Sequence, residues 1–370
     1  MKVPFVDLNT LNSQLKDELQ DAVAAVIEQN DFILGRSVEA FESSFASYVG
    51  RAHCVGVNSG TAALHLALLA MGVQAGDQVI TTPSTWISTC WAISYCDARP
   101  SFADVDPTTG NLDPVSVEKR INERTRAIVA VDLYGNPSRL DMFGELAASR
   151  GIALVDDACQ AHGARLLGRP VGSFGDIACF SFYPAKNLGG FGEGGAVVTD
   201  DPEVAARLRR LRDHAQERRH HHTELGFNYR MDGLQGAVLS VKLRYLDDWN
   251  TARRRAANRY LSELAGIPGI VLPSETPGAK SNWHLFVIRT QNRDAVRQRL
   301  SEMLVETGVH YPVPVHLQPA YAHLGYHRRD FPESERLATS CLSLPMSPVI
   351  SPEEQDRVIE ALSLAAREAA

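Results

Sequence analysis

The feature that most constrains the fold of this 370-residue chain is an alternation of short apolar, β-rich runs with helix-like segments. The β-rich runs lie at residues 54–57, 78–82, 99–104, 127–132, 152–155, 177–182 and 196–199. Between the first two runs, Leu64, Ala67, Leu68 and Met71 recur at the i, i+3, i+4, i+7 spacing of a helix. Strands that alternate with helices over such a length predict an α/β fold with a mostly parallel sheet.

The remaining segments predict two domains. Helical patterns lie at residues 11–30, 37–48, 140–150 and 202–212, and one long helix is expected at 234–259. The last part has more prolines, with short strands expected at 283–289 and 309–315 and helices at 295–306 and 352–367. A chain of this length is long enough for two cores. We therefore expect a large domain over residues 1–248, including the N-terminal helical segment, and a smaller C-terminal α/β domain over 249–370.

Composition and charge exclude several classes of protein. The net charge of −7 argues against a nucleic-acid partner. No apolar run approaches the roughly 18 residues of a membrane span, and the N-terminus lacks the apolar core of a signal peptide. The six cysteines form no CxxC pair, so they are expected to be reduced thiols in a cytoplasmic protein. His220, His221 and His222 have no acidic or cysteine partner at ligand spacing, so we expect no metal site.

The stretch FSFYPAKNLGGFGEGG, residues 180–195, places Lys186 just before five glycines in seven residues. Gly190, Gly192 and Gly195 fit a dinucleotide-binding GxGxxG pattern, but that pattern must open a helix, and here the strand-like AVVTD follows. The segment is therefore predicted to be a hairpin. A lysine after a buried strand can have its pKa lowered by desolvation, which makes the amine a nucleophile. We interpret Lys186 as the residue that carries pyridoxal phosphate (PLP) as a Schiff base, although most lysines are solvated surface charges.

Polar residues at strand ends supply further candidates. Gly60 and Thr61 open a helix after a strand, where free N–H groups can bind an anion or where Ser59 merely caps the helix. Trp86 follows another strand and is either a core residue or a stacking platform for a flat ligand. Asp156 and Asp157 end a third strand; one of them could hold a protonated ring nitrogen, and a helix N-cap pair is the alternative.

The joint occurrence of these motifs resembles the sugar-nucleotide aminotransferases of the DegT/StrS type, which are fold-type-I PLP enzymes. The resemblance extends over nearly the whole chain. It is carried by DFILG, NSGTAALHLAL, VDDACQAHGA, FSFYPAKNLGG, GFNYRMDGLQGAVLSVKL and HYPVPVHLQPAY. In VDLYGNP, by contrast, Asp132 stands where many members of the family have histidine, which puts substrate contacts there in doubt.

The resemblance implies a role for each matching residue. Lys186 is the Schiff-base lysine, Asp157 holds the pyridine nitrogen and Gln160 bonds the ring hydroxyl. The phosphate contacts are Gly60, Thr61 and Ser181, and Trp86 is the stacking aromatic. Asn228 reaches the phosphate of the neighbouring subunit, which implies a homodimer with shared active sites. Tyr183, Tyr311 and His316 border the sugar site.

The resemblance also implies the reaction. Such an enzyme transfers an amino group from L-glutamate to a keto-deoxysugar nucleotide in amino-sugar biosynthesis, and the last motif favours a 3-keto over a 4-keto acceptor. Two alternatives remain open: amination of a keto-cyclitol, and a non-catalytic PLP-fold regulatory protein. Lys186, Asp157 and Gln160 argue against the second alternative, and Lys186 also argues against the related dehydratases.

Overall fold

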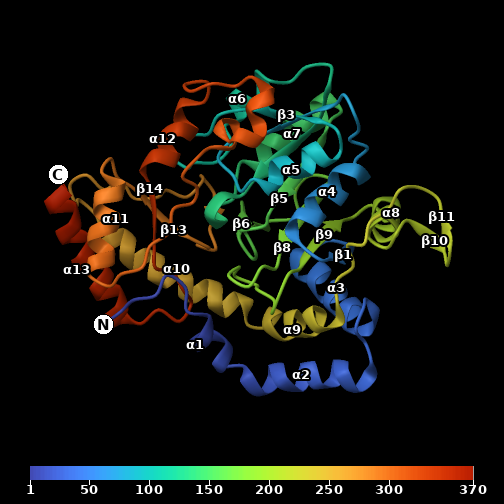
Figure 1. Ribbon diagram of the computed structural model, residues 1–370, viewed down its shortest axis with the longest axis horizontal. Helices are drawn as coiled ribbons and strands as arrows, with labels where there is room; N and C mark the ends of the chain where they lie inside the picture. The colour runs from blue at the N-terminus through green and yellow to red at the C-terminus, as the bar shows by residue number, and fades with distance from the viewer. Residues whose placement is uncertain (370) are drawn as a thin grey trace.

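The computed structural model describes residues 1–369 and is built around one seven-stranded sheet (Figure 1). Its strands, in spatial order, are β1 (His53–Val57), β9 (Gly195–Thr199), β8 (Ile177–Ser181), β5 (Ala153–Asp157), β4 (Thr125–Val131), β2 (Gln78–Thr81) and β3 (Arg99–Phe102). The five strands from β8 to β3 pair in parallel, and β9 runs antiparallel to both of its neighbours. The predicted α/β fold with a mostly parallel sheet is confirmed.

Helices cover both faces of the sheet. One face packs against α3 (Gly35–Val49), α6 (Pro114–Glu118) and α7 (Leu140–Arg150). The other face packs against α4 (Gly60–Ala70), α5 (Ser88–Tyr95) and α8 (Pro202–Arg212). In β4, Ile128 and Ala130 belong to the first core, and Ala127 and Val129 to the second. Burial on both faces explains why the central strands are continuous apolar runs in the sequence.

The N-terminal helices α1 (Leu8–Ser13) and α2 (Lys16–Gln29) lie along α9 (Gly233–Leu243) at the edge of the molecule (Figure 1). The prediction of one long helix at 234–259 is wrong, because α9 ends before a separate helix, α10 (Leu246–Glu263). No glycine or proline marks this break. The residues between the helices, Arg244 and Tyr245, both bond Glu18 of α2 at 2.5 Å, so tertiary contacts hold the bend.

The C-terminal part has its own apolar core. The antiparallel strands β13 (Phe286–Arg289) and β14 (Cys341–Leu344) pack with α10, α11 (Arg293–Glu302) and α13 (Pro352–Ala369). Val3, from the other end of the chain, is buried in the same core. This second core supports the two-domain organisation, and we propose that the division lies near residue 248, at the start of α10.

Two predictions for the C-terminal part need correction. The strand expected at 309–315 is absent; this segment runs irregularly into two short 3₁₀ helices, η2 (Val315–Leu317) and η3 (Pro319–Leu324). Pro312, Pro314 and Pro319 have no N–H to donate to a sheet, which explains the irregular path. The sequence patterns also missed β14 and α12 (Pro332–Ser340), which are short and lack clear periodicity.

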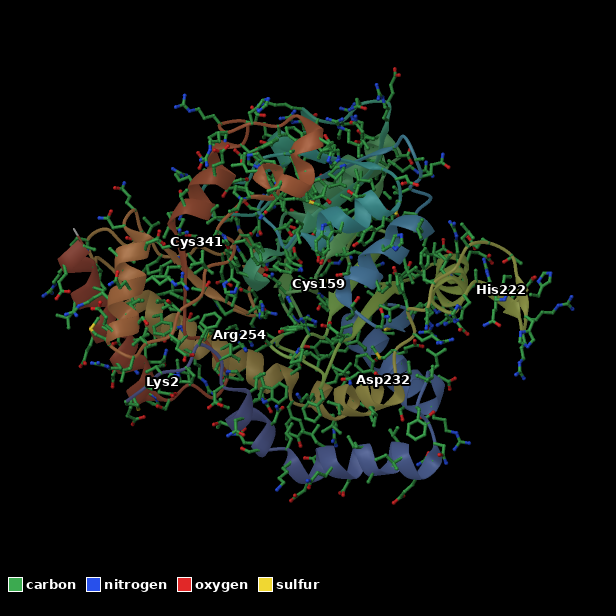
Figure 2. All side chains as sticks on the ribbon, viewed as in Figure 1. Lys2, Cys159, His222, Asp232, Arg254 and Cys341 are labelled. Carbon is green, nitrogen blue, oxygen red and sulfur yellow. The ribbon has the colours of Figure 1, made fainter. Side chains whose placement is uncertain are left out.

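Smaller elements complete the described chain. A 3₁₀ turn, η1 (Leu133–Gly135), follows β4, and β6 (Arg165–Leu166), β7 (Arg169–Pro170) and β12 (Ala279–Lys280) form a small sheet. The histidine-rich loop is an exposed hairpin of β10 (Gln216–Arg218) and β11 (His221–His222) that projects from the body, as His222 shows in Figure 2. Within residues 1–369, no three His, Cys, Asp or Glu side chains cluster as metal ligands, and none of the helices could cross a membrane.

Candidate active site

A cavity of about 490 Å³ lies where β4, β5 and β8 end and α4 begins. Ligands of open α/β sheets bind at such an edge, beyond the carboxyl ends of the strands. The predicted residues that line it are Gly60, Thr61, Trp86, Asp157, Gln160, Ser181, Tyr183, Lys186 and Tyr311. Cys159, labelled near the middle of the molecule in Figure 2, lines the same cavity. The structure thus brings together nine of the eleven candidates, from segments up to 251 positions apart in the sequence (311 − 60 = 251).

Lys186 lies on the loop between β8 and β9, which pair antiparallel as the predicted hairpin requires. Backbone bonds fold this loop tightly: the Lys186 amide donates to the Tyr183 carbonyl at 2.8 Å, and Gly190 donates to Phe182 at 2.8 Å. Burial lowers the pKa of the Lys186 amine, and the nearby groups of Cys159 and Asp157 partly offset that effect. The lowered pKa increases the fraction of neutral amine, the form that can act as a nucleophile or accept a proton.

Three histidines surround Lys186, and sequence reasoning missed all three as site residues. Burial, together with the charge of Lys186, lowers the pKa of His162 to about 3 and that of His310 to about 4. The pKa of His284 is lowered well below its usual value for the same reasons. The three rings are therefore neutral at pH 7 and do not add positive charge around the amine. They come from three separate loops, so no linear spacing could have identified them.

Asp157 ends β5 and is buried with its carboxylate toward the cavity. Its Oδ2 accepts a hydrogen bond of 2.7 Å from the Thr89 hydroxyl, which in turn lies 2.8 Å from the Thr85 hydroxyl. Burial raises the pKa of Asp157, while the Thr89 bond and the charge of Lys186 oppose this rise. The adjacent Asp156 does not line the cavity; its carboxylate accepts from the Gly172 amide at 2.9 Å. The geometry therefore selects Asp157 as the cavity aspartate, and adds Thr89, which the sequence did not indicate.

Gln160 is fixed at both ends of its amide. Its Oε1 accepts from the Tyr134 amide at 2.6 Å, and its Nε2 donates to the Tyr311 hydroxyl at 3.2 Å. The ring of Tyr311 lies 5.5 Å from that of Trp86, at an interplanar angle of 44°. Trp86 and Tyr183 are each about half exposed, at 55% and 52%. These contacts build an aromatic wall on one side of the cavity that is positioned to stack on a flat ligand.

The N-terminus of α4 forms a tight anion-binding corner. Ser59 caps the helix by accepting from the Ala62 amide at 3.1 Å, and Thr61 donates to the Ser88 hydroxyl at 2.9 Å. A Cβ at Gly60 would lie 2.7 Å from the Cβ of Ser181, so only glycine fits there. The free N–H groups and the helix dipole favour a phosphate at this position.

The two remaining candidates lie outside the cavity. His316 is on η2, where its ring is buried against Phe102 and Phe331 and lies 3.3 Å from Glu335. This position does not fit the predicted contact with a sugar, because the irregular path of 309–315 turns His316 into an apolar cluster. Asn228 is exposed on the segment before α9, and its carbonyl accepts from Asn58 at 3.3 Å.

The cavity fits PLP in three independent respects. It has an amine of lowered pKa at Lys186, a buried carboxylate at Asp157 and an anion-binding helix start at Gly60. The fit rests on the chemistry of the donor groups: PLP carries an aldehyde, a basic ring nitrogen and a phosphate that these groups match.

Comparison with known proteins gives the same result. Residues 13–363 match the DegT/DnrJ/EryC1/StrS aminotransferase family. The chain is 47% identical to the erythromycin biosynthesis sensory transduction protein EryC1 of Saccharopolyspora erythraea, over 99% of this chain and 100% of that one. It is 45% identical to a dTDP-3-amino-3,4,6-trideoxy-alpha-D-glucose transaminase of Streptomyces venezuelae, over 98% and 95% of the two chains.

Solved structures agree with the sequence comparison. The crystal structure of S. venezuelae DesV in complex with a ketimine intermediate superposes with a TM-score of 0.97, at 45% identity and over 99% and 98% of the two chains. Other similar chains were solved with PLP or its pyridoxamine form bound. The chain therefore belongs to the DegT/DnrJ/EryC1/StrS aminotransferase family, and its cofactor is PLP.

Proposed function

We propose that this aminotransferase moves an amino group from L-glutamate to a 3-keto-deoxysugar nucleotide, in the biosynthesis of an amino sugar. The observation that carries the proposal is the meeting of Lys186 and Asp157 in one cavity, beside the glycine-capped start of α4. The choice of acceptor is supported by the S. venezuelae relative, whose name places the amino group on carbon 3 of a dTDP-linked sugar.

Each cavity residue has a part in this reaction. When bound, PLP supplies an electron-withdrawing ring that stabilises negative charge at the carbon from which a proton leaves. Lys186 holds the cofactor, and its neutral amine takes the substrate proton onto Nζ and returns it. Asp157, held by Thr89, keeps a proton on the ring nitrogen, and Gln160 donates to the ring hydroxyl. The helix start at Gly60 and Thr61, with Ser181, binds the phosphate, while Trp86 stacks on the ring.

The sugar nucleotide would enter past the exposed aromatic side chains. Tyr183 and Tyr311 line the cavity mouth and offer hydroxyls for the sugar and ring faces for stacking. His316 is not part of this site, because it is buried 3.3 Å from Glu335. Asp132 is also fully buried outside the cavity, so the histidine expected from relatives at this position is not replaced by a substrate contact.

The acceptor class is tested by a panel of substrates offered with L-glutamate to the purified, PLP-loaded enzyme. We expect the dTDP-linked 3-keto-6-deoxyhexose to be aminated with a higher kcat/KM than the 4-keto isomer, and a keto-cyclitol to be aminated poorly. The products are separated by chromatography and identified by mass. A higher kcat/KM for the 4-keto sugar or the cyclitol would contradict the proposed acceptor but not the transaminase assignment.

A regulatory role is the second candidate, because the S. erythraea relative is named as a sensory transduction protein. The intact set of Lys186, Asp157 and Gln160 in the cavity favours catalysis. A protein that only regulates would bind PLP but leave the amino donor unchanged. Loss of the absorbance of the lysine-bound cofactor when L-glutamate is added therefore distinguishes the two.

We further propose that the enzyme is a homodimer in which Asn228 of each chain reaches the cofactor phosphate of the other. Its support is that Asn228 is exposed while the phosphate corner of its own chain lies elsewhere, in the cavity. Two large cavity-mouth side chains, Trp86 and Tyr183, are also half exposed in the single chain. A two-fold symmetric dimer shares residues reciprocally, so each subunit would complete the other's site.

Mixing two inactive variants tests this arrangement. We expect Lys186→Ala and Asn228→Asp each to be inactive as pure proteins. After dissociation and reassociation, half of the dimers are mixed, and each mixed dimer has one intact site. Activity should recover to roughly a quarter of the wild-type value, as random pairing of a two-fold dimer predicts. No recovery, despite chain exchange verified by differently tagged subunits, would show that Asn228 does not serve the partner's site.

A further inference from the structure

A second pair of carboxyl groups lies on the sheet, outside the cavity. Asp132 directly follows β4, and Asp156 is the next-to-last residue of β5; both side chains are fully buried. Ala130 of β4 is paired with Asp156, and the Asp132 amide donates to the Asp157 carbonyl at 3.2 Å. Because successive side chains of a strand point to opposite faces, Asp156 and Asp132 share the face opposite to Asp157.

Each carboxyl is anchored by one oxygen only. Asp132 Oδ1 accepts from the Ser138 amide at 2.7 Å and from the Ser138 hydroxyl at 2.9 Å. Asp156 Oδ2 accepts from the Gly172 amide at 2.9 Å. The other oxygens, Asp132 Oδ2 and Asp156 Oδ1, are buried without any donor among the described residues. The two carboxyls are nevertheless hydrogen-bonded to each other, which is possible only if one of them carries a proton.

The surroundings disfavour two negative charges. The side chains of α3 and α7 that pack on this face of the sheet are apolar, among them Phe45, Val49 and Phe143. The charged groups that act on the pair are Asp157, on the other face, and Arg51, whose guanidinium donates to the Gly172 carbonyl at 2.8 Å. Arg51 is also paired with Asp200 at 2.7 Å, so it does not neutralise the pair. Burial and mutual repulsion raise the pKa of both groups, and such a pair titrates as a unit.

We propose that Asp132 and Asp156 share one proton and, as positioning residues, hold Asp157 in place from the reverse side of the sheet. The link to Asp157 is short on both sides. Asp156 precedes it in β5, and the Asp132 amide bonds its carbonyl. Removing the shared proton would leave two repelling carboxylates at the ends of β4 and β5 and would displace Asp157. The shared proton is independent of the proposed function, whereas its effect on turnover rests on the role proposed for Asp157.

Infrared spectroscopy tests the shared proton on the protein before PLP is added. We expect the carbonyl stretch of protonated carboxylic acids near neutral pH to lose the intensity of one group in Asp132→Asn and likewise in Asp156→Asn. An asparagine donates the hydrogen bond itself, so the remaining carboxylate needs no proton. Asp248→Asn, at an exposed position of α10, is the control and should leave the band unchanged. An unchanged band in either of the paired variants would overturn the shared proton.

A pH profile tests the positioning role on the PLP-loaded enzyme. The rate of reaction with L-glutamate should fall on the alkaline side in the wild type as the pair loses its proton. Asp132→Asn should lack that fall, because its hydrogen bond does not titrate, and Asp132→Ala should react more slowly at every pH. A merely structural role would change the rate without changing the profile. The same alkaline fall in Asp132→Asn as in the wild type would overturn the positioning role, and a wild type inactive with every donor would instead contradict the proposed function.

Discussion

Lys186→Ala should abolish turnover while leaving the fold intact. The side chain lies on a surface-accessible loop and makes no contribution to either apolar core of the sheet, so its truncation should cost little stability. The loss of a positioned proton-transfer group alone lowers a rate by about 10²–10⁴-fold. Here the covalent attachment of PLP is lost as well, so we expect no measurable activity. Steady-state kinetics with L-glutamate and the 3-keto acceptor measure the effect.

Two observations make this result interpretable. Circular dichroism and thermal unfolding should match those of the wild type, and Lys280→Ala, an exposed lysine of β12, should keep full activity. After treatment with borohydride, the wild type should retain PLP covalently and Lys186→Ala should not. Retained turnover together with reducible, covalent PLP in Lys186→Ala would mean that another group holds the cofactor.

Asp157→Asn should leave PLP bound but slow the reaction with L-glutamate by about 10- to 100-fold, because hydrogen bonds to charged groups contribute roughly 1.5–3 kcal/mol. The amide still accepts from Thr89, but it carries no charge to keep a proton on the ring nitrogen. Stopped-flow absorbance of the reaction with the amino donor measures this rate directly.

Asp156→Asn is the matched control for this prediction. Its side chain is equally buried and one residue away, but it bonds the Gly172 amide on the opposite face of the sheet. We expect a much smaller effect near neutral pH, since asparagine keeps a hydrogen bond to Asp132. Equal slowing in the two variants would mean that the cavity aspartate is wrongly assigned.

The parts of the fold that the sequence predicted are those that local patterns determine. The central strands are buried on both faces and so read as apolar runs, and α7 and α8 begin and end as predicted, at residues 140–150 and 202–212. The bend between α9 and α10 was missed because it depends on Glu18, more than 200 residues away. The strand predicted at 309–315 does not form because its prolines cannot donate to a sheet.

The candidate site shows the same division. Lys186, Asp157 and Gly60 lie at strand ends and helix starts, where the local sequence indicates a ligand. Thr89, His162 and His284 reach the site only through the fold, and nothing in their neighbouring residues marks them. Asp132 was noticed as a departure from relatives, but only the structure shows that it faces Asp156 rather than the substrate.

The most direct test of the account follows the amino group itself. Wild-type enzyme loaded with PLP is incubated with ¹⁵N-labelled L-glutamate and the dTDP-linked 3-keto-6-deoxyhexose, and the products are analysed by mass spectrometry and NMR. We predict a dTDP-linked sugar that carries ¹⁵N at carbon 3, formed in equal amount with 2-oxoglutarate. A folded, PLP-loaded enzyme that forms neither product, with this acceptor or with the other keto-sugars and the cyclitol, would contradict the account.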